Sequence, residues 1–97
     1  MIRHVVIFRW QPDTEAAAVA AVSSGLTDLA ARMRGVVRYE HGPDVGINEG
    51  NFDYAVVADF DDVDAFVEYR DHPEHRALIA DRIAPHLAER VAVQYEV

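Results

Sequence analysis

Three segments of the chain alternate apolar and polar residues, a pattern typical of β-strands. They cover residues 2–10, 52–60 and 90–97, and a further strand is predicted over residues 36–41. The centre of the first segment, Val5-Val6-Ile7, is apolar on both faces. Because a strand with this pattern is covered on both sides, the sequence predicts that a layer of side chains packs on each face of the sheet.

Apolar residues recur every three or four positions between these strands, which predicts amphipathic helices. The longest predicted helix covers residues 14–34. Asp13 or Thr14 is expected to be its N-cap, and Gly35 suits its end. Gly25 lies inside this helix and is expected to weaken it by about 1 kcal/mol relative to alanine.

A proline divides the second helical region. Pro73 lacks a backbone donor and favours extended geometry at His72, whereas proline suits the first position of a helix. Two helices are therefore predicted, one that starts at Asp61 or Asp62 and ends near residues 69–71, and one over residues 73–85.

The predicted order is strand, helix, strand, strand, broken helix, strand. This order is typical of the ferredoxin-like (split βαβ) fold, an α+β architecture with a four-stranded antiparallel sheet and its helices on one face. The 97 residues suffice for a single domain over residues 1–97. Since the helix-free face is also apolar, we expect a homodimer in which two sheets pack face to face and close into a barrel.

The composition of the chain limits the kinds of molecule that it is expected to bind. The net charge is −8, the isoelectric point is near 4.9 and no cysteine is present. An acidic chain without clusters of cationic residues is not expected to bind nucleic acid, and no apolar run approaches the ~20 residues that span a membrane. Disulfides and thiolate chemistry are excluded. The first apolar run is too short for a signal peptide, so a cytoplasmic location is expected.

Candidate acid–base chemistry lies beside the proline, where Tyr69 and His75 are predicted to approach each other. His75 shares an apolar helix stripe with Ile79 and Ile83. It could be a general base that partial burial keeps neutral, or a buried histidine satisfied by one backbone carbonyl. Tyr69 could donate its proton to a carbonyl oxygen as enolate charge develops, or could be an amphipathic helix end with its hydroxyl in water.

Four further residues are candidates for substrate binding: His4, Phe8, Tyr54 and His72. His4 shares a strand face with Phe8 and would line the same cavity as His75, or it could be a strand-end imidazole bonded to a neighbour. Phe8 and Tyr54 could line a pocket for an aromatic ligand or belong to the core. His72 is expected to cap the last helix or support the turn rather than contact a ligand.

The motifs of resident cofactors are missing. His72 and His75 are three residues apart, but no third metal ligand accompanies them, so no metal site is predicted. Without a glycine-rich phosphate loop or a dinucleotide fingerprint, no cofactor is expected. His41 and His86 are expected at the surface.

Three parts of the chain resemble the stress-responsive A/B barrel (Dabb) domain family. These are residues 1–8, the motif Tyr69-x-x-His72-Pro73-x-His75, and residues 95–97. The resemblance covers nearly the whole chain and implies a ferredoxin-like protomer that forms a dimeric α+β barrel.

The family includes a plant polyketide cyclase, and the resemblance to it implies a reaction that needs no cofactor. Its catalytic tyrosine and histidine match Tyr69 and His75, and two further histidines match His4 and His72. The chain departs from that cyclase at two positions. Ala55 replaces a histidine, and Gln94 replaces an aspartate that supports the catalytic imidazole, so His75 would need another group to orient it.

The resemblance implies a barrel that binds a small apolar or aromatic carbonyl compound. It could be a cofactor-free polyketide cyclase or an isomerase-like enzyme. The alternative is a non-catalytic, stress-responsive ligand-binding or structural barrel. A cofactor-free monooxygenase is a third class, since other dimeric α+β barrels have that activity, but no residue here is specific to it.

Overall fold

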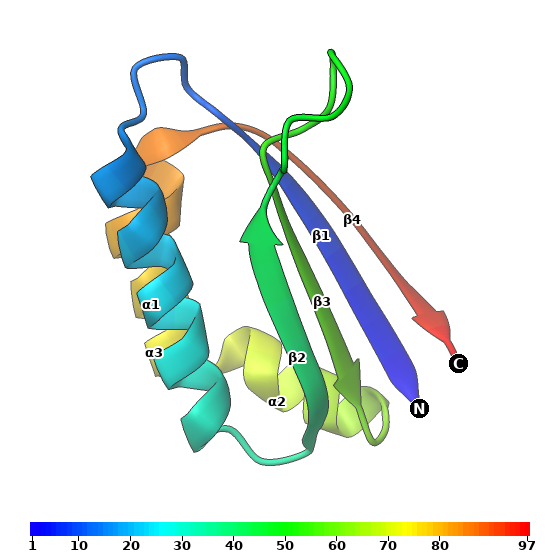
Figure 1. Ribbon diagram of the computed structural model, residues 1–97. Helices are drawn as coiled ribbons and strands as arrows, with labels where there is room; N and C mark the ends of the chain where they lie inside the picture. The colour runs from blue at the N-terminus through cyan, green and yellow to red at the C-terminus, as the bar shows by residue number, and fades with distance from the viewer.

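The computed structural model describes residues Met1–Val97 and shows helices packed on one face of an antiparallel sheet (Figure 1). The strands are β1 (Ile2–Trp10), β2 (Val36–Pro43), β3 (Tyr54–Phe60) and β4 (Leu87–Glu96). The helices are α1 (Ala16–Arg32), α2 (Val63–Asp71) and α3 (Pro73–Leu78), then a π-helical turn η1 (Ile79–Ile83) and a 3₁₀ turn η2 (Ala84–His86). The strand order β2-β3-β1-β4 confirms the predicted ferredoxin-like fold.

The core lies between the sheet and the helices. Alternate residues of β1 and β3 face the helices, and their register places Val6 opposite Val56 and Phe8 opposite Tyr54. From α1, the stripe predicted by its apolar periodicity is buried at Val22, Leu26 and Leu29. The thirteen hydrophobic residues of this cluster form one continuous core.

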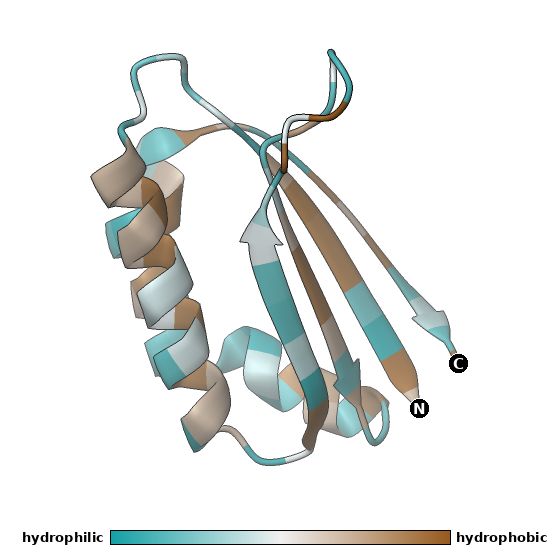
Figure 2. Ribbon diagram, viewed as in Figure 1, coloured by the Kyte–Doolittle hydropathy of each residue, from teal (hydrophilic) through white to brown (hydrophobic).

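The other face of the sheet carries no helix, as Figure 1 shows. β1 contributes Val5 and Ile7 to this face, and the register of β4 places Val93 and Val91 opposite them. Val91 and Val93 are 48% and 55% exposed. Figure 2 shows hydrophobic residues along the middle of β1 and β3. The strands therefore carry apolar side chains on both faces, as their sequences indicate, and only one face is covered within the protomer.

Several boundaries differ from the sequence predictions. The expectation that Asp13 or Thr14 caps α1 is wrong, because residues 11–14 form a turn closed by a bond from the Thr14 N–H to the Gln11 carbonyl. The helix begins two residues later, and its N-cap Glu15 makes no side-chain bond. The α2 cap is Asp62, whose carboxylate accepts from the Ala65 N–H.

The last helical region is less regular than predicted. α3 ends at Leu78, and the chain continues through a π turn and a 3₁₀ turn that contains Pro85. β4 then starts at Leu87 rather than at Arg90, because Leu87 already pairs with Trp10 at the end of β1. A proline early in a short 3₁₀ turn both ends the helix and redirects the chain toward the sheet.

Gly25 is the point at which α1 and α3 approach each other. A Cβ atom at this position would lie 2.5 Å from Cδ1 of Leu78 and 3.0 Å from Nη1 of Arg82. Leu78 is itself buried, so its side chain has little freedom to move aside. The glycine therefore permits close packing of the helices, a role that its helix propensity alone does not indicate.

We expect Gly25→Ala to destabilise the protein by about 1 kcal/mol, because overpacking outweighs the gain of about 1 kcal/mol in helix propensity. Urea unfolding at a fixed protomer concentration measures this change. Ser24→Ala is the matched control on the exposed side of the same turn and should be neutral or slightly stabilising. Stabilisation of the Gly25→Ala variant by the full propensity difference would contradict the packing argument.

The apolar helix-free face generates a second prediction. Val93→Asp places a charge in this face and should shift the protein from dimer to monomer, because a buried unpaired carboxylate costs several kcal/mol. Val63→Asp is the control, since Val63 is similarly exposed (58%) but lies at the start of α2. Sedimentation equilibrium of both variants measures the effect. An unchanged dimer in Val93→Asp would show that this face is not the interface.

Candidate functional site

The break between α2 and α3 rearranges the backbone hydrogen bonds around Pro73. In a continuous helix the Tyr69 carbonyl would accept from residue 73, but proline has no N–H. The Tyr69 carbonyl instead accepts from the His72 N–H at 3.3 Å. The His72 side chain becomes the N-cap of α3, because its Nδ1 accepts from the Glu74 N–H at 3.1 Å.

The break at His72 also leaves the Arg70 carbonyl without its helical donor. In a continuous helix that carbonyl would accept from the Glu74 N–H, which here donates to the His72 imidazole. The Arg70 carbonyl accepts from Nδ1–H of His75 instead, at 3.0 Å. Because a carbonyl can only accept, the proton of the neutral His75 ring lies on Nδ1 and its Nε2 is an unprotonated acceptor.

His75 is half-buried beside Tyr69, and their ring centroids are 4.3 Å apart. Burial lowers the pKa of His75 below its usual value, although the bond to the Arg70 carbonyl acts in the opposite direction. The imidazole is therefore neutral at pH 7, the state in which it can take a proton.

Tyr69 provides a protonated phenol. Its side chain is 3% exposed, and burial raises its pKa to about 12. Its hydroxyl lies 2.7 Å from the hydroxyl of Tyr39, and this bond offsets part of the rise in pKa. A buried phenol that keeps its proton at neutral pH is a hydrogen-bond donor for a ligand oxygen.

His4 has the opposite tautomer to His75. The Gln94 side-chain Nε2 donates to Nδ1 of His4 at 2.8 Å, so the proton of the neutral ring lies on its Nε2. His4 is 5% exposed. Burial lowers its pKa to about 4, and the positive charge of Arg90 acts in the same direction. The neutral His4 is thus a hydrogen-bond donor, whereas the neutral His75 is an acceptor.

A cavity of about 80 Å³ brings these groups together between the sheet and the helices. His4 and Phe8 reach it from β1, Tyr69 from α2 and His75 from α3. The remaining apolar wall consists of Val6, Leu26, Val56, Phe66, Ile79, Ile83 and Leu87, and Arg70 and Arg90 complete the lining. An apolar cavity with a few convergent polar groups is the usual form of a small-molecule site.

Two predicted site residues lie away from this cavity. His72 caps α3, as its place before the proline indicated. The hydroxyl of Tyr54 lies 2.7 Å from Nδ1 of His41 and 2.7 Å from Oγ of Ser23, in a separate polar cluster. The expectation that His41 and His86 lie at the surface is wrong, because both are half-buried. The bond to the Tyr54 hydroxyl holds the His41 imidazole in place.

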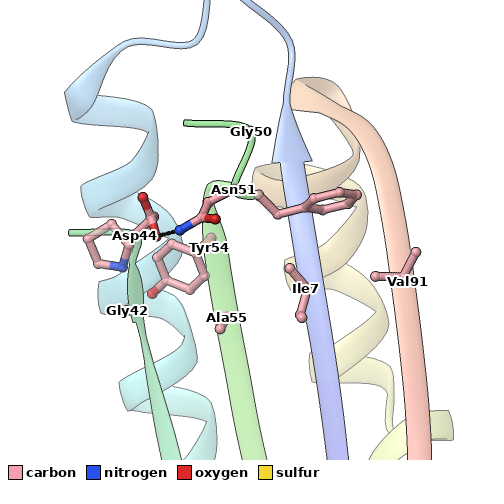
Figure 3. A pocket seen from close by; sticks show the side chains of 10 residues that line it. Ile7, Gly42, Asp44, Gly50, Asn51, Tyr54, Ala55 and Val91 are labelled. Carbon is pink, nitrogen blue, oxygen red and sulfur yellow. Dashed lines mark hydrogen bonds between the residues drawn. The ribbon is translucent and has the colours of Figure 1, made fainter. Parts of the chain in front are cut away.

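A wider hollow of about 550 Å³ lies on the helix-free face, where Ile7 of β1, Ala55 of β3 and Val91 of β4 line it (Figure 3). The loop between β2 and β3 borders it, and Nδ2 of Asn51 donates to the Asp44 carboxylate there at 3.2 Å. This hollow belongs to the surface on which we expect a second copy to pack. It contains none of the histidines of the smaller cavity.

Sequence reasoning missed three features of the site. Tyr39 was not a candidate, although its alternation with Arg38 and Glu40 places it on the helix side of β2. Gln94 supports His4 rather than His75, and the Arg70 carbonyl orients His75. Arg90 also lines the cavity. Of these contacts, the pairing of Gln94 with His4 follows from the strand register, and the contact of Tyr39 with Tyr69 depends on the packing of α2 against the sheet.

No group of three or more His, Asp or Glu side chains is arranged to hold a metal ion, and no helix has the length and apolarity to span a membrane.

Solved structures share this fold. A dimeric ferredoxin-like protein of unknown function from Thermobifida fusca is 46% identical, with a TM-score of 0.92 over 99% of this chain and 90% of that chain. A Dabb family protein from Mesorhizobium loti is 23% identical, with a TM-score of 0.82 over 99% and 95%. The hydroxynitrile lyase from Passiflora edulis is 18% identical, with a TM-score of 0.84 over 99% and 92%. No curated protein sequence matches the chain.

The topology and these likenesses define an α+β protein of the ferredoxin-like class whose relatives include dimers. The stress responsive A/B barrel domain (Dabb) matches residues 2–97. The chain belongs to the Dabb family, which confirms the resemblance seen in its sequence.

Burial of the neutral His4 ring makes stability depend on pH. An unfolded histidine titrates near ~6.5, whereas the pKa of His4 in the folded protein is about 4. The unfolded chain therefore binds the proton more readily as pH falls through this range. We expect the free energy of unfolding to decrease by up to about 3 kcal/mol from His4 alone between these two values, with full stability retained above the higher one.

Urea unfolding at a fixed protomer concentration across this pH range measures the effect. His4→Gln should remove the part of the slope that His4 causes and leave the part due to other histidines. His86→Gln, outside the cavity, should keep the full slope. Parallel slopes for His4→Gln and the parent protein would contradict the assignment.

Proposed function

We propose that this chain is the protomer of a homodimeric barrel that binds a small carbonyl compound and moves a proton next to the carbonyl without a cofactor. The pair of histidines with opposite tautomers supports this proposal most strongly. Nε2 of His75 is an acceptor and Nε2–H of His4 is a donor, and both side chains line one apolar cavity. Abstraction of a proton beside a carbonyl needs one group of each kind.

The proposed step begins with the carbonyl oxygen between the Tyr69 hydroxyl and Nε2–H of His4. Nε2 of His75 takes a proton from the adjacent carbon, and the electron pair of that C–H bond moves to the oxygen to form an enolate. The two donors stabilise the new charge, and the apolar wall excludes water that would weaken these bonds. The imidazolium keeps its Nδ1–H bond to the Arg70 carbonyl.

Tyr39 is part of the donor arrangement. When its hydroxyl donates to the oxygen of Tyr69, the Tyr69 proton is free for the ligand, and a chain of two phenols strengthens the outer hydrogen bond. The enolate then has two outcomes. The proton returns to a different carbon, which is an isomerisation, or the enolate carbon attacks a second carbonyl of the same molecule, which is an aldol-type cyclisation.

The size of the cavity limits what enters it. Its volume of about 80 Å³ is roughly half of the ~150 Å³ that holds benzene in an engineered apolar cavity. The reacting carbonyl and its neighbouring carbons fit, whereas the rest of a polyketide or an aromatic compound would lie at the mouth. A short aliphatic carbonyl compound is therefore the preferred ligand class.

A second candidate function is ligand binding without catalysis. Gln94 supports this reading, because it carries no charge that would stabilise an imidazolium and its bond goes to His4. The catalytic reading has support at the level of the fold, since a protein with this fold is a hydroxynitrile lyase. The experiment below separates the two candidates.

Exchange of carbonyl-adjacent protons for deuterium, followed by ¹H NMR in D₂O, tests the proposed step without knowledge of the product. Short aliphatic ketones and diketones serve as substrates. We expect His75→Gln to slow exchange by at least ~100-fold, because the base is lost, and Tyr69→Phe to slow it by ~10- to 100-fold. His86→Gln, a histidine outside the cavity, should leave the rate unchanged.

The pH profile provides an independent check. Because burial lowers the pKa of His75, the exchange rate should rise with pH, level off below the usual histidine value of ~6.5 and stay constant at neutral pH. Ligand binding without catalysed exchange would establish the binding function instead. Parent-like exchange in both His75→Gln and Tyr69→Phe would remove the assigned roles.

A further inference from the structure

The arginines of this acidic chain are nearly all paired. All nine cationic side chains are arginines. Six form ion pairs with carboxylates, and a seventh, Arg82, donates to the Ala21 carbonyl at 2.8 Å. The two without a hydrogen bond or ion pair are Arg34 and Arg90. Of these, only Arg90 lines the cavity.

Arg90 stands on the cavity side of β4. It pairs in register with Phe8 of β1 and is exposed, so it lies at the rim rather than in the depth of the cavity. Its positive charge acts on both imidazoles, since it adds to the effect of burial in lowering the pKa of His4 and of His75. Arg90, His4 and His75 line the same small cavity, so one ligand in it can contact all three side chains.

The other arginine of the cavity is already neutralised. Nε and Nη2 of Arg70 donate to the two carboxylate oxygens of Asp71 at 2.9 and 3.1 Å. Arg90 has no such carboxylate, although the chain carries 17 acidic residues. The cavity lining contains no aspartate or glutamate, so no protein group there offsets the charge of Arg90.

We propose that Arg90 is a specificity-determining residue that binds a carboxylate of the ligand at the rim of the cavity. A guanidinium presents two parallel N–H donors that match the two oxygens of a carboxylate. With the carboxylate at Arg90, the carbonyl of a short molecule extends inward toward Tyr69 and His4. The ligand class is then a short aliphatic oxo acid. The inference that the ligand has a carbonyl group rests on the proposed function, whereas the inference that it has a carboxylate depends on Arg90 alone.

A matched pair of ligands tests this inference. 4-Oxopentanoate and 4-oxopentanamide have the same shape and the same ketone, but only the first has a charge. Titration of ¹⁵N-labelled protein by NMR measures both affinities. We expect the parent protein to bind the acid about tenfold more tightly than the amide, because a charge-assisted bidentate contact is available only to the acid.

Three variants assign the preference to Arg90. Arg90→Gln should weaken binding of the acid about tenfold and leave the amide unchanged, and Arg90→Lys should retain part of the preference. Arg34→Gln is the control, because it removes the other unpartnered arginine away from the cavity. Higher salt should reduce the affinity for the acid only.

The outcomes separate this inference from the proposed function. Equal affinity for acid and amide in the parent protein, including no measurable binding of either, overturns the role of Arg90. A preference for the acid that survives in Arg90→Gln overturns it as well. Proton exchange of the amide that depends on His75 would then still support the proposed chemistry. Conversely, Arg90-dependent binding of the acid without exchange would refute the chemistry and keep the carboxylate site.

Discussion

The interruption of helical hydrogen bonding at Pro73 is the constraint on which the site depends. Because the proline ring favours extended geometry at His72, the helix breaks there, and the Glu74 N–H donates to the His72 imidazole instead of to the Arg70 carbonyl. The released carbonyl fixes the ring of His75 and selects its tautomer. The helix break at Pro73 thus leads, through the His72 side chain and the Arg70 carbonyl, to a defined proton position on the His75 imidazole.

The two imidazoles and the phenol of the cavity each have a defined hydrogen-bond partner. The Arg70 carbonyl acts on His75, the Gln94 amide on His4 and the Tyr39 hydroxyl on Tyr69. Such groups would be costly to bury without partners, and hydrogen bonds among them are stronger in an apolar surrounding than in water. The same bonds that satisfy these side chains also prepare them as acceptor and donors.

The fold was predictable because its signals are local. Alternation along β1 and β3 identified the two faces of the sheet, and Pro73 located the helix break. The N-cap of α1 was not predictable, because a turn formed ahead of it competes for the same residues. Tyr39 and Arg90 were not identified, and Gln94 was not assigned to His4, for a different reason. Their partners are fixed by strand register and by packing across the sheet, which periodicity within one segment does not encode.

β4 belongs to two surfaces at once. Its alternation places Gln94 and Arg90 beside the cavity, and it places Val91 and Val93 on the opposite apolar face. In the proposed homodimer, a ligand that shifts this strand by even a small amount also changes the fit of the apolar face between the two copies. Thermodynamic linkage then requires reciprocity: occupancy of the cavity alters the affinity between protomers by the same factor by which assembly alters the affinity for the ligand.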